Sequence, residues 1–282
     1  MLGKLDPSAR FPFDRHSAIR RVTSEPIMFA TVQRALVMDV AHAKVGQGVA
    51  DHSGFRRQPM TRLWSTTDAG VRLVFGDSEM AREAARHVYR IHDHINGSTA
   101  DGAAYTAHDA SLLLWVWATL VDSFDTGFTR WVRPFRPGES DEFYADMVSF
   151  ATFFGIPPEL IPPDRASFAA YLDAQLDDPA LGTSAASAEM AHDVLFFKHW
   201  NVPAAVVRPT RVLAILTLDE RLRGRLGLEL DWRDRRLADR LDGLLKAHYG
   251  KLPAIRTQVP STYIFFRRPT IGLGKRLRSL LP

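Results

Sequence analysis

Apolar residues recur every three or four positions along almost the whole chain, which is the spacing that places them on one face of an α-helix. The segment from Asp77 to Ser123 shows this pattern most clearly. Asp77 can accept hydrogen bonds from the free backbone N–H groups of a first helix, and Gly97 is expected to end that helix. A second helix is expected to begin after Asp109. The apolar stripe of the first helix consists of Met80, Ala84, Val88, Ile91 and Ile95.

The rest of the pattern predicts an all-α protein, folded as a single large multi-helix domain with at most a short strand pair. A buried helix over residues 26–45 follows a start signal at Ser24-Glu25-Pro26. Glycines and a proline within residues 46–60 predict tight turns, and Val71 to Phe75 is typical of a short strand. Pro203 and Pro209 are expected to bracket another turn. Further helices are predicted over residues 61–67, 140–154, 164–178, 184–199, 210–226 and 232–249.

Charge and proline content suggest three parts of the chain. Residues 1–23 are basic and contain Pro7 and Pro12, so we expect an irregular N-terminal segment. Residues 24–260 should form the helical domain. Residues 261–282 form a basic tail, which is typical of a loosely packed terminus or of a segment that touches an acidic membrane surface.

Composition excludes several kinds of site. None of the 282 residues is cysteine, which excludes thiolate haem ligation, iron–sulfur clusters and cysteine nucleophiles. The longest apolar run, Leu112 to Val121, is about half as long as a membrane span, and the N-terminus lacks the apolar run of a secretion signal. We therefore expect a cytoplasmic protein. The formal net charge of +4 is spread along the chain and the arginine-rich helices also carry acidic residues, so no nucleic-acid partner is expected.

His92 is the main candidate for a metal or haem ligand. It lies at the edge of the apolar stripe, one turn after Val88, and a histidine that points from a helix into an apolar cavity can bind a buried iron. A core histidine bonded to a backbone carbonyl gives the same pattern. His94 is about 200° away from His92 around the helix, and His87 is about two turns from His94, so these pairs cannot share one small coordination sphere.

Three further residues are candidates for a cofactor site. Arg62 and Thr66 are four residues apart and share a helix face, where an arginine and a hydroxyl can hold an anion or polarise an oxygen species. The same pair also occurs as a helix cap or a surface ion pair. Trp115, with Trp117, can form one wall of a binding site for a flat cofactor. Two tryptophans at this spacing are also typical of an ordinary hydrophobic core.

A set of short motifs in a fixed order carries a resemblance to a known family. The motifs cover most of residues 25 to 235, and they include Gln33-Arg34-Ala35-Leu36, Ala41-His42, His52-Ser53-Gly54-Phe55, Arg62-Leu63, Thr66, Ile91-His92 and Leu112-Leu113-Leu114-Trp115-Val116. In these motifs the chain resembles the superfamily of the latex-clearing rubber oxygenase and the mycophenolic-acid oxygenase B.

The resemblance implies an all-α fold that binds haem b. It implies that His92 is the proximal iron ligand and that Arg62 and Thr66 lie near the haem. Rubber-cleaving members carry a lysine directly before the threonine, and here that position is Ser65. Ala43 replaces the proline that commonly follows the histidine of the first helix. The serine makes rubber itself an unexpected substrate.

These observations lead to two hypotheses of function. The first is a haem b-dependent oxygenase that uses O₂ on a small hydrophobic substrate, such as an isoprenoid or another alkene. A histidine ligand leaves the opposite face of the iron open to O₂ and favours O–O cleavage less than a thiolate does. Arg62 would then offer charged N–H donors and Thr66 a hydroxyl. The alternative is a non-catalytic helical protein that binds haem or another hydrophobic ligand.

Overall fold

The helical periodicity of the sequence produces helices that surround one long central helix, α6 (Ala110–Gly127). The computed structural model describes residues 13–52, 59–151, 155–196 and 204–251, without the side chains of residues 29, 59–64, 204 and 206. Over these ranges the chain forms twelve α-helices and one antiparallel strand pair, which confirms the predicted all-α single domain.

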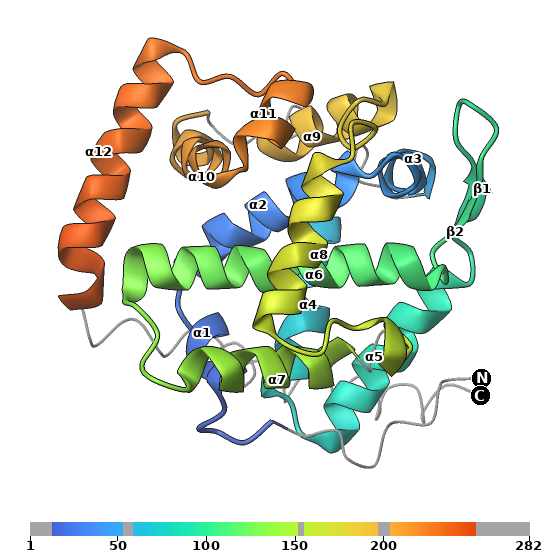
Figure 1. The fold of residues 1–282 in the computed structure, drawn as a ribbon, viewed down its shortest axis with the longest axis horizontal. Helices are drawn as coiled ribbons and strands as arrows, with labels where there is room; N and C mark the ends of the chain where they lie inside the picture. The colour runs from blue at the N-terminus through green and yellow to red at the C-terminus, as the bar shows by residue number, and fades with distance from the viewer. Residues whose placement is uncertain (1–12, 53–58, 152–154, 197–203, 252–282) are drawn as a thin grey trace, which may run out of the picture.

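The elements follow one another with short connections, and Figure 1 shows α6 crossing the middle of the molecule with α12 along one side. Helices α1 to α5 precede α6, and a strand pair (β1 and β2) lies between α5 and α6. Their bounds are α1 Ala18–Thr23, α2 Met28–Ala41, α3 Ala43–His52, α4 Pro59–Phe75, α5 Ser78–His92, β1 Asn96–Ser98, β2 Ala104–Thr106, α7 Glu139–Ala151, α8 Arg165–Asp177, α9 Ala185–Phe196, α10 Ala204–Thr217, α11 Glu220–Arg225 and α12 Trp232–His248.

Helix α6 contributes to both clusters of buried apolar side chains. Trp117 belongs to the cluster formed with α1, α5 and α7, and its indole N–H donates to the Met147 carbonyl at 2.7 Å. Trp115 belongs to the cluster formed with α2, α9 and α10, and its indole N–H donates to the Met38 carbonyl at 3.1 Å. Burying two such large side chains removes much apolar surface from water, which fixes α6 between its neighbours.

Buried Arg34 adds polar ties between three helices. From α2 it donates to the Ser123 hydroxyl at 2.7 Å, pairs with Asp122 of α6 at 2.6 Å, and donates to the Thr217 carbonyl of α10 at 2.9 Å. A buried guanidinium needs such partners, because its charge is costly to remove from water. The position of Arg34 in one of the motifs therefore has a structural explanation.

Several predicted boundaries are wrong. Val71 to Phe75 is not a strand but the last turns of α4, where Leu73 and Val74 are buried. Of the turns predicted over residues 46–60, those at residues 46–52 are wrong, because α3 runs through Gly46 and Gly48, and residues 53–58 lie outside the described residues. The two glycines serve packing: a Cβ on Gly46 would lie 2.5 Å from the Val40 carbonyl oxygen, and one on Gly48 would lie 3.3 Å from the Tyr105 ring.

Other ends of helices also differ from the prediction. The helix expected over residues 26–45 is divided at His42, whose extended backbone (ψ 123°) ends α2. Gly97 does not end α5, which already stops at His92; it pairs with Tyr105 across the strand pair, where a Cβ would lie 2.7 Å from the tyrosine hydroxyl. Pro209 lies inside α10 rather than in a turn.

The predicted termini are only partly within the described residues. Ala18–Thr23 forms α1 instead of the irregular segment expected up to residue 23, because Ile19 and Val22 are buried against the core. The basic tail from residue 261 onward lies outside the described residues. Among the helices that the structure describes, none has both the length and the apolar character needed to span a membrane.

Candidate functional site

A cavity of about 540 Å³ lies between helices α2, α4, α5 and α6. Its wall is largely apolar, and α3 and the strand pair cover the remaining side. Cavities of roughly 300–1,000 Å³ with apolar walls and a few polar groups are typical of sites for small ligands and cofactors. The helices that form the wall contribute successive turns of their apolar stripes, including Val32, Leu36, Val71, Val88, Ile91, Leu113, Val116 and Leu120.

Helix α5 carries the predicted ligand His92 to this wall. The Asp77 carboxylate accepts a hydrogen bond from the Met80 N–H at 3.0 Å, so the predicted cap is confirmed. Fifteen residues later the helix ends at His92, which is half-buried and lines the cavity together with Val88 and Ile91. His87 lines the same cavity from one and a half turns earlier.

The surroundings of His92 contain a second imidazole. The ring centroids of His92 and His108 are 6.0 Å apart and nearly perpendicular. His108 is in turn 2.8 Å from the Asp93 carboxylate through Nε2, and its ring packs against Tyr89 at 4.5 Å. The Asp93 carboxylate thus holds His108 beside His92. This contact restrains the C-terminal end of α5, where the last backbone carbonyls have no partner within the helix.

Helix α4 brings Thr66 to the wall of the same cavity. Thr66 and its neighbour Ser65 both line the cavity, and α4 packs against α5 along its length. Arg62 belongs to the same helix one turn earlier, but its side chain lies outside the described residues. The structure therefore brings His92 and Thr66 to one cavity, as the sequence predicts.

Trp115 does not line this cavity. Its side chain is 1% exposed and lies in the second buried cluster, where its indole also donates to the Asp39 carbonyl at 3.3 Å. Its role in the structure is to join α6 to α2, so we do not include it in the cofactor site.

Several polar groups in the wall were not predicted from the sequence, among them Asp39, Lys44 and Tyr105. Burial raises the pKa of the Asp39 carboxyl to about 7, although a hydrogen bond with Thr119 acts in the opposite direction. The Tyr105 hydroxyl donates to the Asp51 carboxylate at 2.8 Å, and burial together with this bond raises the pKa of Tyr105 to about 12. Asp39 could have been found, because it stands alone among apolar residues on one face of a predicted helix.

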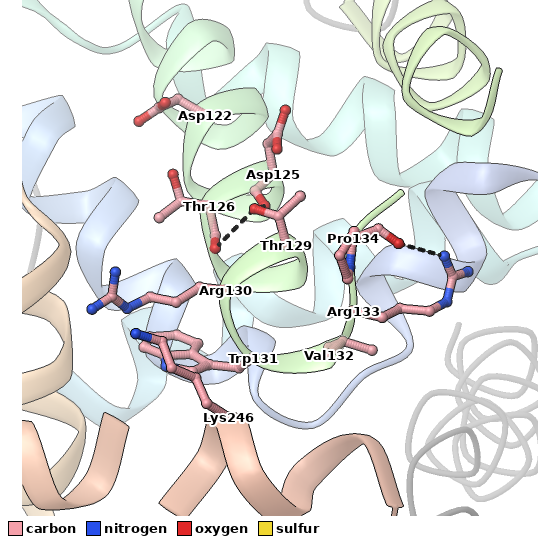
Figure 2. A pocket seen from close by; sticks show the side chains of 10 residues that line it. All are labelled: Asp122, Asp125, Thr126, Thr129, Arg130, Trp131, Val132, Arg133, Pro134 and Lys246. Atoms are coloured by element: carbon pink, nitrogen blue, oxygen red, sulfur yellow. Dashed lines mark hydrogen bonds between the residues drawn. The ribbon is translucent and has the colours of Figure 1, made fainter. Parts of the chain in front are cut away.

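A second hollow, of about 800 Å³, lies at the surface where α6 continues into a π-helical turn, η2 (Phe128–Val132). Figure 2 shows Asp122 and Asp125 toward one end of it and Arg130 and Lys246 toward the other. All four are already engaged in ion pairs, which are Asp122–Arg34, Asp125–Arg165, Arg130–Asp242 and Lys246–Asp242. These charges hold helices together, so the apolar cavity is the better candidate site.

The donor set of the cavity suits a cofactor that needs a single protein ligand. Within the described ranges, no three His, Asp or Glu side chains come together as a metal site. A mononuclear zinc or non-haem iron site normally takes three such ligands. Haem brings four nitrogen ligands of its own and needs one axial imidazole. An apolar cavity with His92 in its wall fits that requirement.

Comparison with known proteins gives the family. A family model described as "ER-bound oxygenase mpaB/B'/Rubber oxygenase, catalytic domain" matches residues 19–247. The chain belongs to this family. The match runs from α1 nearly to the end of α12 and includes every element that lines the cavity. Neither the search of curated proteins nor that of solved structures finds a match.

Membership of the mpaB/rubber oxygenase family defines the kind of activity at a coarse level. The matched region is an oxygenase catalytic domain, and the chain is therefore an oxidoreductase by family. The resemblance found in the sequence is confirmed at this level. The cofactor, the substrate and the roles of single residues are matters for proposal.

Proposed function

We propose that this chain is a haem b-dependent oxygenase that uses O₂ on a small hydrophobic substrate with a carbon–carbon double bond. The observation that carries the proposal is the apolar cavity of about 540 Å³ that has His92 in its wall. The family match supports oxygenase activity, and the wall of the cavity favours a hydrophobic substrate.

His92 is the proposed axial ligand. It lies in the last turn of an amphipathic helix whose cap and apolar stripe hold it at the cavity. When bound through His92, haem would supply an iron that reacts with O₂. The apolar wall excludes water and keeps a hydrophobic substrate beside the reacting group.

Thr66 and Arg62 are the proposed polar groups near the haem. Thr66 lines the cavity, and its hydroxyl can donate a hydrogen bond to an oxygen atom there. Arg62 lies on the same face of α4 one turn earlier. A guanidinium at this position could donate hydrogen bonds to a haem propionate. The serine at position 65, in place of the lysine of rubber-cleaving members, favours a substrate other than rubber.

Absorption spectroscopy of the haem-reconstituted protein tests the ligand. We expect a Soret band for wild type and for His87→Ala, since His87 lines the cavity without serving as ligand. His92→Ala should lose or shift the band, and added free imidazole should restore it by entering the space that the side chain leaves. A colourless wild type, or loss of the band in His87→Ala instead, would contradict the assignment.

Oxygen consumption tests the reaction. With myrcene, a small isoprenoid, as the alkene and ascorbate as reductant, we expect O₂ uptake and oxygenated products that disappear in His92→Ala. A Soret band without O₂ uptake with this alkene would support the alternative, a helical protein that binds haem without catalysis.

A further inference from the structure

Asp39 is a carboxyl group in the wall of an otherwise apolar cavity. It lies on α2, where Val32, Leu36 and Asp39 are separated by four and three residues and therefore share one face. All three line the cavity, yet Asp39 is only 9% exposed. A carboxyl group in this position faces ligand rather than bulk water.

The hydrogen bonding of Asp39 leaves one oxygen available. The Thr119 hydroxyl of α6 lies within hydrogen-bond distance of Oδ1 of Asp39 and also of the Val116 carbonyl, at 2.7 Å, and among the described residues it is the one side chain that bonds the carboxyl group. An ionised carboxylate usually has several donors or a cation beside it, since burying an unpaired charge is costly. A neutral carboxylic acid needs only one acceptor for its proton, and Oδ2 can carry that proton toward the cavity.

The charged groups around the cavity do not neutralise Asp39. Among the residues that the structure describes, the other titratable side chains that line it, besides Tyr105, are Glu25, Lys44, His87 and His92. On the helices packed against α2, Asp122 is paired with Arg34, and Arg208 and Arg211 are paired with Asp234. Burial raises the pKa of Asp39 and the hydrogen bond with Thr119 lowers it. The effect of burial is the larger one, and the resulting pKa is about 7.

We propose that Asp39 is the polar anchor of the cavity: a neutral carboxylic acid whose O–H donates a hydrogen bond to an uncharged oxygen acceptor, such as a ketone or ester, on an otherwise hydrophobic ligand. This inference rests on the proposed function, because it takes the same cavity as the ligand site. It narrows the substrate class from any small alkene to one that also carries an uncharged oxygen.

Two probe ligands with the same number of carbon atoms distinguish the contribution of the hydrogen bond to the binding affinity from that of the hydrophobic contact. Binding of methyl nonyl ketone and of n-undecane to the haem-reconstituted protein is followed by calorimetry at about pH 5, below the raised pKa of Asp39. We expect wild type to prefer the ketone by about five- to tenfold, the usual gain from one net hydrogen bond. The preference should fall at about pH 9, where the ionised carboxylate no longer donates.

Variants test the side chain itself. In Asp39→Leu, which keeps the size but removes both oxygens, the preference for the ketone should vanish while n-undecane still binds. Asp39→Asn should keep part of the preference at both pH values, because its amide donates without titrating. Asp146→Asn, at a buried aspartate outside the cavity wall, is the matched control and should leave the preference unchanged.

Infrared spectroscopy gives a reading that needs no ligand. Wild type at about pH 5 should show a protonated carboxyl C=O band that Asp39→Asn lacks and that disappears at about pH 9. Absence of this band, or equal binding of both probes by wild type, would overturn the role of Asp39 and leave the haem proposal intact. If neither probe bound, the cavity would not be the ligand site, and the proposed substrate class would fail as well.

Discussion

Glu139 shows how one buried charge joins three parts of the chain. Its carboxylate accepts two hydrogen bonds from Arg133, at 2.6 and 2.8 Å, and one from Arg21 of α1 at 3.1 Å. It also accepts the Arg136 backbone N–H at 3.0 Å. The bonds from Arg133 are the main cause that lowers the pKa of Glu139 from 4.5 to about 2. The charged form is therefore the one that the fold stabilises.

This shift gives a prediction about acid stability. Because the pKa is lower in the folded state, the contribution of Glu139 is complete above pH 4.5 and is lost as the pH falls toward about 2. Glu139→Gln should reduce the free energy of unfolding by roughly 1–3 kcal/mol at neutral pH, measured by urea denaturation. The difference from wild type should shrink as the pH falls.

The nearby Glu142 is the matched control for this prediction. Its side chain is 60% exposed and pairs only with Arg21 among the ion pairs of the described residues. Glu142→Gln should cost less than about 1 kcal/mol, as solvent screens an exposed pair. A Glu139→Gln variant that is as stable as Glu142→Gln would show that the buried bonds contribute no net stability.

Single residues also show how far the sequence could predict the residues that line the cavity. His92 and Thr66 could be placed at one cavity because helical spacing and the family motifs both point to them, and the structure brings them there. Asp39 stands alone among apolar residues on its helix face, which is visible in the sequence, but its burial and its bond with Thr119 depend on the tertiary structure. Trp115 and Trp117 have the same side chain two residues apart, and only the packing shows that they enter different clusters.

At the scale of elements, helix starts with an acidic cap were predictable and glycine-containing segments were not. Asp77, Asp109, Asp164 and Asp231 each accept a backbone N–H at the start of a helix, which is a local interaction that the sequence displays directly. Gly46 and Gly48 lie in α3 because of what packs against them, and that depends on tertiary structure. Sequence alone cannot distinguish a glycine that allows a turn from one that allows close packing.

Two glycine variants test this explanation. Gly46→Ala would place a methyl group 2.5 Å from the Val40 carbonyl oxygen and 3.2 Å from the Ser187 Cα. Neither backbone atom can move without shifting a helix, so the variant should lose about 1–3 kcal/mol of unfolding free energy. Gly243→Ala, inside α12 with no atom within 4 Å of the added carbon, should instead gain about 0.5–1 kcal/mol.

Urea denaturation of both variants, with circular dichroism as the signal, measures the two effects. Opposite shifts of the midpoint support packing as the reason for Gly46. A stabilised Gly46→Ala would mean that α3 can move away from both α2 and α9 enough to accept a methyl group, which the contacts of α3 with these helices argue against.

Helix α12 depends on charges more than on apolar contacts. Ala238 and Asp242 are its buried residues. Asp242 accepts hydrogen bonds from Arg130 at 2.6 Å and from the Trp131 indole at 2.9 Å, and pairs with Lys246 at 2.7 Å. Burial acts to raise the pKa of Asp242, but the bonds from Lys246, Arg130 and Trp131 keep it below its ordinary value.

Removing that charge should loosen α12 before it affects the rest of the molecule. In Asp242→Asn, amide hydrogens of α12 should exchange about tenfold faster or more, measured by mass spectrometry, because the partners on η2 lose the negative charge and one of the two oxygen atoms that accept their hydrogen bonds. Asp239→Asn, at an exposed position of the same helix, should leave exchange unchanged. Equal exchange in the two variants would indicate that apolar contacts alone hold α12.

At the scale of the whole molecule, the cavity lies where the two buried clusters meet around α6. Residues from the first cluster, such as Leu113 and Phe150, line it, and so do Val40 and Val194 from the second. A ligand in the cavity would therefore contact both clusters at once. The family match extends over nearly all of the described helices, which agrees with a site that needs the complete fold.

The double membership of α6 also governs how the chain can come apart. Each cluster contains one tryptophan of α6, so unfolding of this helix would expose the apolar side chains of both clusters. Arg34 would at the same time lose two of its partners, Ser123 and Asp122. We therefore expect the two clusters to unfold together rather than one after the other. Cleavage within α6 should disrupt the cavity along with both clusters.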